Sequence, residues 1–273
     1  MSPLALVLAL GAAFLHASWN LVLRGRRDTD TSTALMLCVG VVVFLPVALI
    51  GWDVRAEVWP YLVATWILEL AYFAILAGAY RRAELSLVYP LARGLAPVLV
   101  LLIGVLALGV APTALEGLGV LLVGAGVVLV RGLRGGDTLG AALAASAAFT
   151  IAGYTLVDRA GLRYAAPITY LVLALAVPGL VYLGYVLWTR GLPAVRAQLQ
   201  PSVAAAGVMM VGAYGLVLLA LRLAPAASVA AVRESGVVMA TAMAAWFLHE
   251  RVSRQRFAGA ALVVVGVAAL ALG

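Results

Sequence analysis

The sequence predicts an all-α membrane protein of ten transmembrane helices, arranged as two inverted five-helix repeats. Composition indicates the membrane, because 66% of the 273 residues are hydrophobic and only 11% are charged. About a quarter of the residues in a soluble domain are usually charged, so a water-soluble chain of this length could not bury so much apolar surface. The length of the apolar runs predicts helices, and similarity between the two halves of the chain predicts the repeat.

A spanning helix needs about 20 mainly apolar residues, and the first half of the chain holds five such runs. They do not alternate in polarity as membrane strands would. Charged residues, proline or glycine end each run. The first ends before Arg24, the second between Thr31 and Gly51, the third before Arg81, the fourth before Pro112, and the fifth at Arg131. We predict helices over residues 3–23, 33–51, 58–80, 85–109 and 114–131.

The second half holds five further runs with the same kinds of boundary. The sixth lies between Asp137 and Asp158, the seventh between Arg163 and Arg190, the eighth between Pro201 and Arg222, the ninth after Pro225, and the tenth after Arg256. We predict helices over residues 138–157, 166–188, 201–221, 226–248 and 256–272.

The two halves resemble each other in order. Moving the second half back by about 140 residues lays residues 233–267 on 93–127, so that Arg233 falls on Arg93. Similar shifts match AFTIAGYTLVDR (148–159) with AFLHASWNLVLR (13–24), and Ala213-Tyr214 with Ala71-Tyr72. We predict one membrane domain of two repeats, 1–132 and 133–273. Because five is odd, the second repeat would enter the membrane from the opposite side, as in many secondary transporters.

Glycines seven residues apart in the fifth and tenth predicted helices lie two turns apart on one face, where helices can approach closely. The pairs are Gly117 and Gly124, Gly119 and Gly126, and Gly259 and Gly266.

Arginine supplies every positive side chain and gives the chain a net charge of +7. The arginines are scattered between apolar runs, so we predict no nucleic-acid partner. Twelve lie in odd-numbered connectors and four in even-numbered ones. The positive-inside rule then places the odd connectors in the cytoplasm and both termini outside, in a prokaryotic inner membrane.

Charged and polar residues at membrane depth are costly and therefore mark candidate sites. Arg93 and Arg233 are repeat equivalents, Glu234 follows Arg233, and Glu69 lies inside the third helix. We predict that these residues and others line a water-accessible substrate site: His16, Asn20, Trp19, Trp66, Tyr72, Tyr89, Tyr154 and Tyr214.

Structural alternatives stand beside these assignments. His16 could bond a backbone carbonyl of a neighbouring helix, and Arg233 could pair with Glu234 or Glu69. Each tryptophan or tyrosine could equally belong to the core or to an interfacial belt. Asp158 lies one residue beyond a predicted span, and we expect it to be interfacial or structural.

Motifs for catalysis are absent from the sequence. Two histidines and one cysteine, Cys38, do not make a zinc site, and there is no GxxxxGK[ST], HExxH or GxSxG. We therefore predict no enzyme, no cofactor and no metal, and a transport process driven by an existing gradient.

Three stretches resemble the ten-helix EamA-type transporters of the drug/metabolite transporter superfamily. They are HASWNLVLR (16–24), the related segments 71–98 and 213–235, and FLHERVSRQRFAGAALVVVGV (247–267). In the last, Glu250 stands at the family's glutamate, but Val110 occupies the equivalent place in the first half. The resemblance implies a central cavity, alternating access, and export or exchange of small metabolites. It also implies cytoplasmic termini, whereas the arginine count favours the opposite orientation, which we adopt.

Together these features predict a secondary active transporter of a small polar metabolite, anionic or zwitterionic, such as an amino acid, organic phosphate or phosphonate. Two arginines suit an anionic group, while Glu69 or Glu234 could receive an amine or a coupling proton. The expected partners are the substrate and the lipid bilayer, and the protein would be a monomer or a homodimer. The alternatives are a broad exporter of aromatic or cationic compounds and an intramembrane lipid-handling protein.

Overall fold

A computed structural model describes residues 1–23, 28–82, 85–131, 138–248 and 253–273. These residues form α-helices joined by short connectors, with one 3-10 turn, η1 (Ala56–Val58), and one isolated β-bridge. The all-α prediction is confirmed. The helices are α1 (Pro3–Leu23), α2 (Thr29–Ile50), α3 (Trp59–Arg82), α4 (Leu85–Leu108), α5 (Ala114–Arg131), α6 (Thr138–Gly161), α7 (Pro167–Gln198), α8 (Pro201–Leu221), α9 (Ala226–Arg233), α10 (Gly236–Leu248) and α11 (Arg254–Leu272).

Each of the ten predicted spans coincides with a helix or, for the ninth, with two. Eight segments in the described part of the chain are long and apolar enough to cross a membrane. The apolar part of α5, Ala114–Val130, is shorter, and the ninth span is divided into α9 and α10. At about 1.5 Å per residue, α5 still approaches the thickness of the hydrocarbon layer.

The ninth span differs from its prediction as one continuous helix. It is interrupted at Glu234 and Ser235, between the end of α9 and the start of α10 at Gly236. A Cβ atom on Gly236 would lie 2.9 Å from the carbonyl oxygen of Ala13 in α1. The serine-glycine pair therefore allows α1 to pass close to the break, in keeping with the tendency of such pairs to bend helices.

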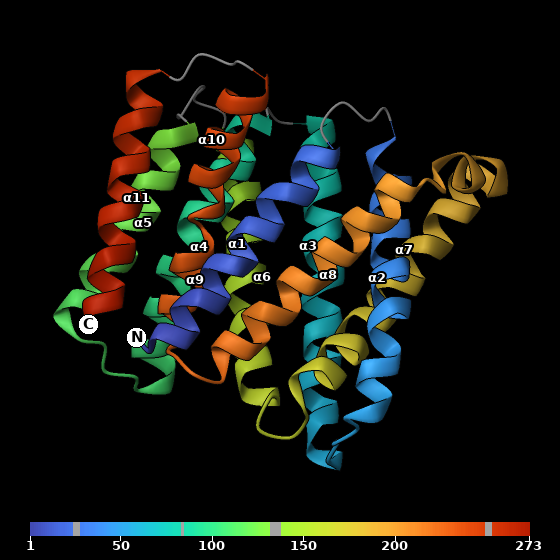
Figure 1. Ribbon diagram of the computed structural model, residues 1–273, viewed down its shortest axis with the longest axis horizontal. Coiled ribbons are helices and arrows are strands. Elements are labelled where there is room, and N and C mark those ends of the chain that lie inside the picture. Colours follow the sequence, from blue (N-terminus) through green and yellow to red (C-terminus); the bar gives the residue numbers. More distant parts are fainter. Residues whose placement is uncertain (24–27, 83–84, 132–137, 249–252) are drawn as a thin grey trace.

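The seventh span also continues beyond its predicted end at residue 188. Helix α7 changes direction at Gly191, whose φ of 75° lies in the left-handed region that glycine adopts without strain. The segment after Gly191 runs to Gln198 and protrudes at the right of Figure 1.

Helices α5 and α11 meet through the predicted glycines. A Cβ atom on Gly119 would lie 2.8 Å from the Gly266 carbonyl oxygen, and one on Gly126 would lie 2.7 Å from the Gly259 carbonyl oxygen. Gly119 and Gly259 are repeat equivalents, as are Gly126 and Gly266. Exchanging the two halves therefore turns one contact into the other, which is the self-complementarity that a two-fold axis imposes.

The other helix pairings obey the same exchange. Helix α1 packs on α8, and its repeat-equivalent pair, α6 on α3, is also in contact. Helix α4 packs on α6, while its counterparts, α9 and α10, pack on α1. Helices α2 and α7, which are equivalents of each other, pack together on the right of Figure 1, while α5 and α11 pack together on the left. The two-repeat architecture is confirmed.

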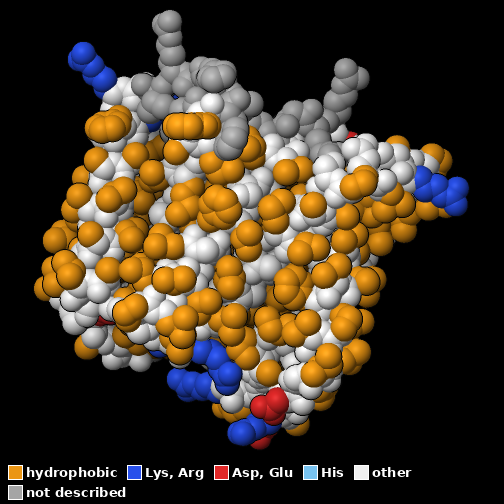
Figure 2. Space-filling view, viewed as in Figure 1, with side chains coloured by type: hydrophobic (Ala, Val, Ile, Leu, Met, Phe, Trp, Pro, Cys, Tyr) orange, Lys and Arg blue, Asp and Glu red, His pale blue; other side chains and the backbone are white. Residues whose placement is uncertain are grey.

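The bundle has an apolar surface between two ends, the upper and lower sides of Figure 1, that carry charged residues. Both termini lie on the lower side in Figure 1, where α7 begins, and α1 and α3 run from there to the upper side. Figure 2 shows hydrophobic side chains over the middle of the visible face, with charged side chains at its upper and lower ends. Such a surface matches the hydrocarbon layer and headgroup zones of a bilayer, and the chain is an integral membrane protein.

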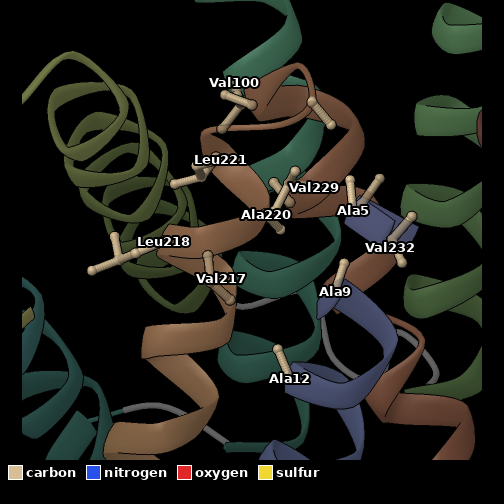
Figure 3. Packing of buried hydrophobic residues seen from close by; sticks show 14 of the residues in the cluster. Ala5, Ala9, Ala12, Val100, Val217, Leu218, Ala220, Leu221, Val229 and Val232 are labelled. Carbon is tan, nitrogen blue, oxygen red and sulfur yellow. The ribbon is translucent and has the colours of Figure 1, made fainter. Parts of the chain in front are cut away.

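Small side chains build the interior where α1 meets α8 and α9. Ala5, Ala9 and Ala12 of α1 are fully buried and lie close to Val229 and Val232 of α9 (Figure 3). Without a hydrophobic driving force between helices in lipid, such close approach supplies the packing that holds the bundle together.

Replacing Gly126 by alanine is expected to destabilise the α5–α11 contact. The added methyl group would meet backbone atoms of α11 at 2.7–2.8 Å, and overpacking of this kind costs about 1–3 kcal/mol. The matched control is Gly117→Ala in the same helix, where a Cβ atom meets nothing within 4 Å. Thermal unfolding in detergent should show a lower midpoint for Gly126→Ala and an unchanged or higher one for Gly117→Ala. Equal midpoints for the two variants would contradict the glycine-mediated packing.

Candidate functional site

Five charged side chains are buried together inside the helix bundle. Glu69 comes from α3, Arg93 from α4, Asp158 from α6, and Arg233 and Glu234 from the end of α9. Each retains 8% or less of its exposure, and Asp158 retains none. The cluster contains residues of both repeats, so it lies where the two halves of the bundle meet.

Glu234 is the link between the two arginines. Its Oε2 accepts a hydrogen bond from Nε of Arg93 at 2.9 Å, and its Oε1 lies 3.8 Å from Nε of Arg233. The two arginines belong to packed helices, α4 and α9, and approach the same carboxylate. The pairing of Arg233 with Glu234 was one of the structural alternatives.

Glu234 lies at the break in the ninth span, directly after Arg233. Arg233 occupies the last turn of α9, where the carbonyl ends of the helix favour a cation, and Glu234 follows at the boundary with α10. Nε of Arg233 is buried and donates no hydrogen bond to any described residue. This arginine therefore holds a directed N–H group that an incoming acceptor could use.

Asp158 was expected to be interfacial or structural, and it does not lie at the interface. The predicted sixth span stopped at residue 157, whereas α6 continues for another turn to Gly161. Asp158 is therefore inside the bundle. Three hydroxyl groups from three other helices surround it: Thr65 Oγ1 (α3) and Tyr170 Oη (α7) donate to Oδ1 at 2.6 and 2.9 Å, and Tyr214 Oη (α8) donates to Oδ2.

The hydroxyls that hold Asp158 are themselves fixed by packing. Tyr170 is fully buried and its hydroxyl oxygen lies 3.2 Å from that of Thr65. Its ring covers Gly161, where a Cβ atom would lie 2.5 Å from a ring carbon. Thr65 and Tyr170 were not singled out in the sequence. One available signal was the four-residue spacing from Thr65 to Glu69, which places both on one face of α3.

Glu69 faces the same region from α3. It is buried, and Asp158 and Arg233 are both near enough to interact with it electrostatically. It forms no hydrogen bond with another described residue. Glu69 thus differs from Glu234, whose Oε2 accepts a hydrogen bond from Arg93, and from Asp158, both of whose oxygens accept hydrogen bonds.

Two predicted aromatic residues border the cluster. Tyr154 of α6 and Tyr214 of α8 meet edge to face, with ring centroids 6.3 Å apart. Tyr154 lies within electrostatic range of Arg233, Glu69 and Arg93. Rings in this position offer rigid apolar walls with polar tips.

Most of the other predicted site residues make polar or aromatic contacts of their own. Asn20 Nδ2 donates to the carbonyl oxygen of His16 in its own helix at 2.7 Å, and Trp66 Nε1 donates to the Leu173 carbonyl of α7 at 2.9 Å. His16 and Trp19 meet edge to face at 4.9 Å. Tyr72 packs against Phe73, with ring centroids 5.7 Å apart. The side chain of Tyr89 lies outside the described residues.

The ionised forms of the cluster do not balance. Three carboxylates, Glu69, Asp158 and Glu234, stand beside two guanidinium groups, Arg93 and Arg233. Arg93 and Glu234 neutralise each other, which leaves Arg233 shared between Glu69 and Asp158. Fully ionised, the cluster would carry one excess negative charge in a low-dielectric environment, where such a charge is costly.

This conformation keeps the cluster away from water. Two hollows lie at the periphery of the described part of the molecule, one between α2 and the start of α8, the other beside α5 and α11. Neither is lined by a charged residue of the cluster. Because each charged side chain keeps 8% or less of its exposure, we expect access to the cluster to require movement of the helices.

Comparison with known proteins gives one family and a related fold. The model of the EamA-like transporter family matches residues 3–132 and again residues 138–272. A solved structure titled "Crystal structure of protein" is 20% identical, with a TM-score of 0.79, covering 98% of this chain and 96% of that chain. At this identity the likeness shows the fold alone. No curated protein matches the chain.

Proposed function

Because the chain belongs to the EamA-like transporter family, whose members are membrane transporters of small molecules, we propose that it is a secondary active transporter of a zwitterionic metabolite. The observation that carries the substrate class is the buried cluster of three carboxylates and two arginines between the repeats. A molecule with one cationic and one anionic group complements both kinds of side chain. Amino acids and aminophosphonates have this form.

The anionic group of the substrate would bind Arg233. A guanidinium stays charged and offers parallel N–H donors to a carboxylate or phosphonate. Nε of Arg233 has no acceptor among the described residues, while Arg93 is engaged by Glu234. Arg233 is therefore the arginine that can accept a ligand without first breaking a 2.9 Å ion pair.

The cationic group of the substrate would bind at Glu69. Its carboxylate has no hydrogen-bond donor within the described part of the chain, and Tyr154 and Tyr214 lie nearby. Because the cluster is closed in this conformation, loading requires one side of the bundle to open, as alternating access does. We place the odd connectors, which hold most of the arginines, in the cytoplasm of a prokaryotic cell.

A second candidate function is export of cationic or aromatic compounds. The excess of carboxylates over arginines and the Tyr154–Tyr214 pair favour it. In that case Glu69 and Asp158 would bind the cargo, and both arginines would serve only to stabilise the fold.

A thermal-shift screen of the detergent-purified protein separates the two candidates. The compounds are amino acids, aminophosphonates, organic phosphates and aromatic amines, and a ligand at 100 times its Kd stabilises the folded state by about 2.7 kcal/mol. For each compound that binds, Arg233→Lys should weaken zwitterion binding about tenfold, since lysine lacks the planar fork. Arg55→Lys, on the exposed connector after α2, is the control. Binding of amines alone, undiminished in Arg233→Lys, would favour the second candidate.

Counterflow in proteoliposomes then tests transport itself. Vesicles preloaded with the unlabelled compound should accumulate its labelled form only when they contain the protein, and Arg233→Lys should slow that accumulation. Compounds that bind without counterflow would count against a transport function.

A further inference from the structure

The excess charge of the buried cluster needs a balancing positive charge in the empty protein. Glu69, Asp158 and Glu234 together carry one more negative charge than Arg93 and Arg233 can neutralise. Asp158 and Arg233 both lie within electrostatic range of Glu69, and Arg233 lies within range of Asp158. Within the described part of the chain, no three acidic, histidine or cysteine side chains are close enough to hold a metal ion.

We propose that Glu69 and Asp158 share one exchangeable proton, and that this proton is displaced when the cationic group of the substrate binds. The proton comes from water and forms an O–H bond on one of the two carboxyl groups. The role in transport rests on the proposed function, whereas the proton itself is argued from the charges of the five described side chains.

The groups that face the pair come from every helix around it. Thr65 and Glu69 belong to α3, Tyr154 and Asp158 to α6, Tyr170 to α7, Tyr214 to α8 and Arg233 to α9, with Arg93 and Glu234 adjoining. Arg93 is joined to Glu234 by an ion pair, so Arg233 is the remaining counter-charge.

The hydroxyl shell of Asp158 suits a carboxyl that changes its protonation state. A hydroxyl can both donate and accept, so Thr65, Tyr170 or Tyr214 can reverse its hydrogen bond when Asp158 gains a proton. Backbone N–H groups or arginines could not do so, because they only donate. These three residues lie on α3, α7 and α8, and a change at Asp158 therefore reaches three neighbouring helices.

Charge balance gives an unusual expectation for single substitutions. Replacing either Glu69 or Asp158 by its amide leaves two carboxylates and two arginines, so the remaining carboxyl should lose its proton. Glu69→Gln and Asp158→Asn should each remove the whole signal, whichever residue carries the proton. Arg233→Gln should have the opposite effect and add a second proton.

The test is infrared spectroscopy of the full chain reconstituted in lipid at neutral pH, without substrate and with potassium as the salt. We expect one protonated carboxyl band that shifts in deuterium oxide, is absent from Glu69→Gln and from Asp158→Asn, and about doubles in Arg233→Gln. The control is Glu57→Gln, an exposed residue outside the bundle, which should leave the band unchanged. Each variant must elute as a single folded species on size exclusion. Glu69→Gln is the mildest of them, because it breaks no hydrogen bond among the described residues.

Absence of the band from the parent, or its survival in either amide variant, would overturn the proposal. Since no substrate is used, failure of every compound in the binding screen counts against the proposed function and not against the shared proton.

Discussion

Replacing Glu234 by alanine is expected to be the most damaging single change in the polar cluster. Its carboxylate accepts a 2.9 Å bond from Arg93 and lies 3.8 Å from Arg233, and it is 1% exposed. Removing one partner of a buried ion pair leaves the other charge uncompensated and usually costs about 3–5 kcal/mol. We therefore expect a much lower midpoint of thermal unfolding in detergent, together with loss of transport.

Two further variants show whether the loss of stability in Glu234→Ala comes from the broken ion pair. Glu57→Ala removes the same charge from an exposed position and should leave the unfolding midpoint unchanged. The double variant Arg93→Met with Glu234→Met removes both charges and should recover much of the lost stability, because replacing a buried pair by apolar residues is often neutral. Transport should stay absent in the double variant. A Glu234→Ala protein as stable as the parent would show that the ion pair contributes little to the fold.

A disulfide between positions 54 and 165 is expected to stop transport reversibly. Val54 lies in the connector after α2 and Ala165 in the connector after α6, and an antiparallel β-bridge joins these connectors from opposite repeats. Hydrogen bonds from the amide of Arg55 to the Tyr164 carbonyl and from the amide of Ala166 to the Asp53 carbonyl flank the pair, each at 2.9 Å. This places Val54 and Ala165 at a non-hydrogen-bonded position, where Cα atoms are about 4.5 Å apart, within disulfide range.

The disulfide keeps one end of the bundle closed until it is reduced. Alternating access requires each end to open in turn, so fixing the bridge should trap the carrier with this end closed. The background is Cys38→Ser, since Cys38 is the one native cysteine. Counterflow by Val54→Cys with Ala165→Cys should fall to the level of empty vesicles after oxidation and return with a reductant. Each single-cysteine variant is the control. Undiminished counterflow in the oxidised pair would mean that this end does not open.

On the opposite side of the bundle, the two repeats meet through a different kind of contact. Arg190 near the bend of α7 donates to Asp28 and Asp30 at the start of α2. Burial acts to raise the pKa of Asp28, but hydrogen bonds from Thr31 and Arg190 and the charge of Arg190 lower it below its ordinary value. The contact therefore persists at neutral pH and joins α2 of the first repeat to α7 of the second.

The helices could be predicted from the sequence because the bilayer imposes a length. An apolar run near 20 residues bounded by arginine, proline or glycine has few alternatives to a spanning helix, and all ten predicted spans appear. The glycines of α5 and α11 also followed from the sequence, since two turns of helix always return to one face. Gly117 is the exception in that set, because it faces open space.

The predicted ends of the spans were less accurate, and one of them left Asp158, a fully buried carboxylate, outside its helix. A charged residue is a natural place to end an apolar run, so the sixth span was stopped before Asp158. The sequence cannot show that Thr65, Tyr170 and Tyr214 would bring hydroxyl donors to that residue from 93, 12 and 56 positions away. Those donors make it possible for α6 to continue for one more turn with a charge inside the bundle.

The sequence by itself determined the membrane, the number of spans, the two inverted repeats, and four of the five charged residues of the cluster: Glu69, Arg93, Arg233 and Glu234. Periodicity and the cost of charge in lipid act along the chain, so they can be read from it. Only the tertiary structure decided which charges meet. Arg93 and Arg233 approach one carboxylate where the ninth span breaks at Glu234, next to the close passage of α1 at Gly236. Such ion pairs form between helices that are far apart in sequence. The packing of those helices decides which of several possible partners meet.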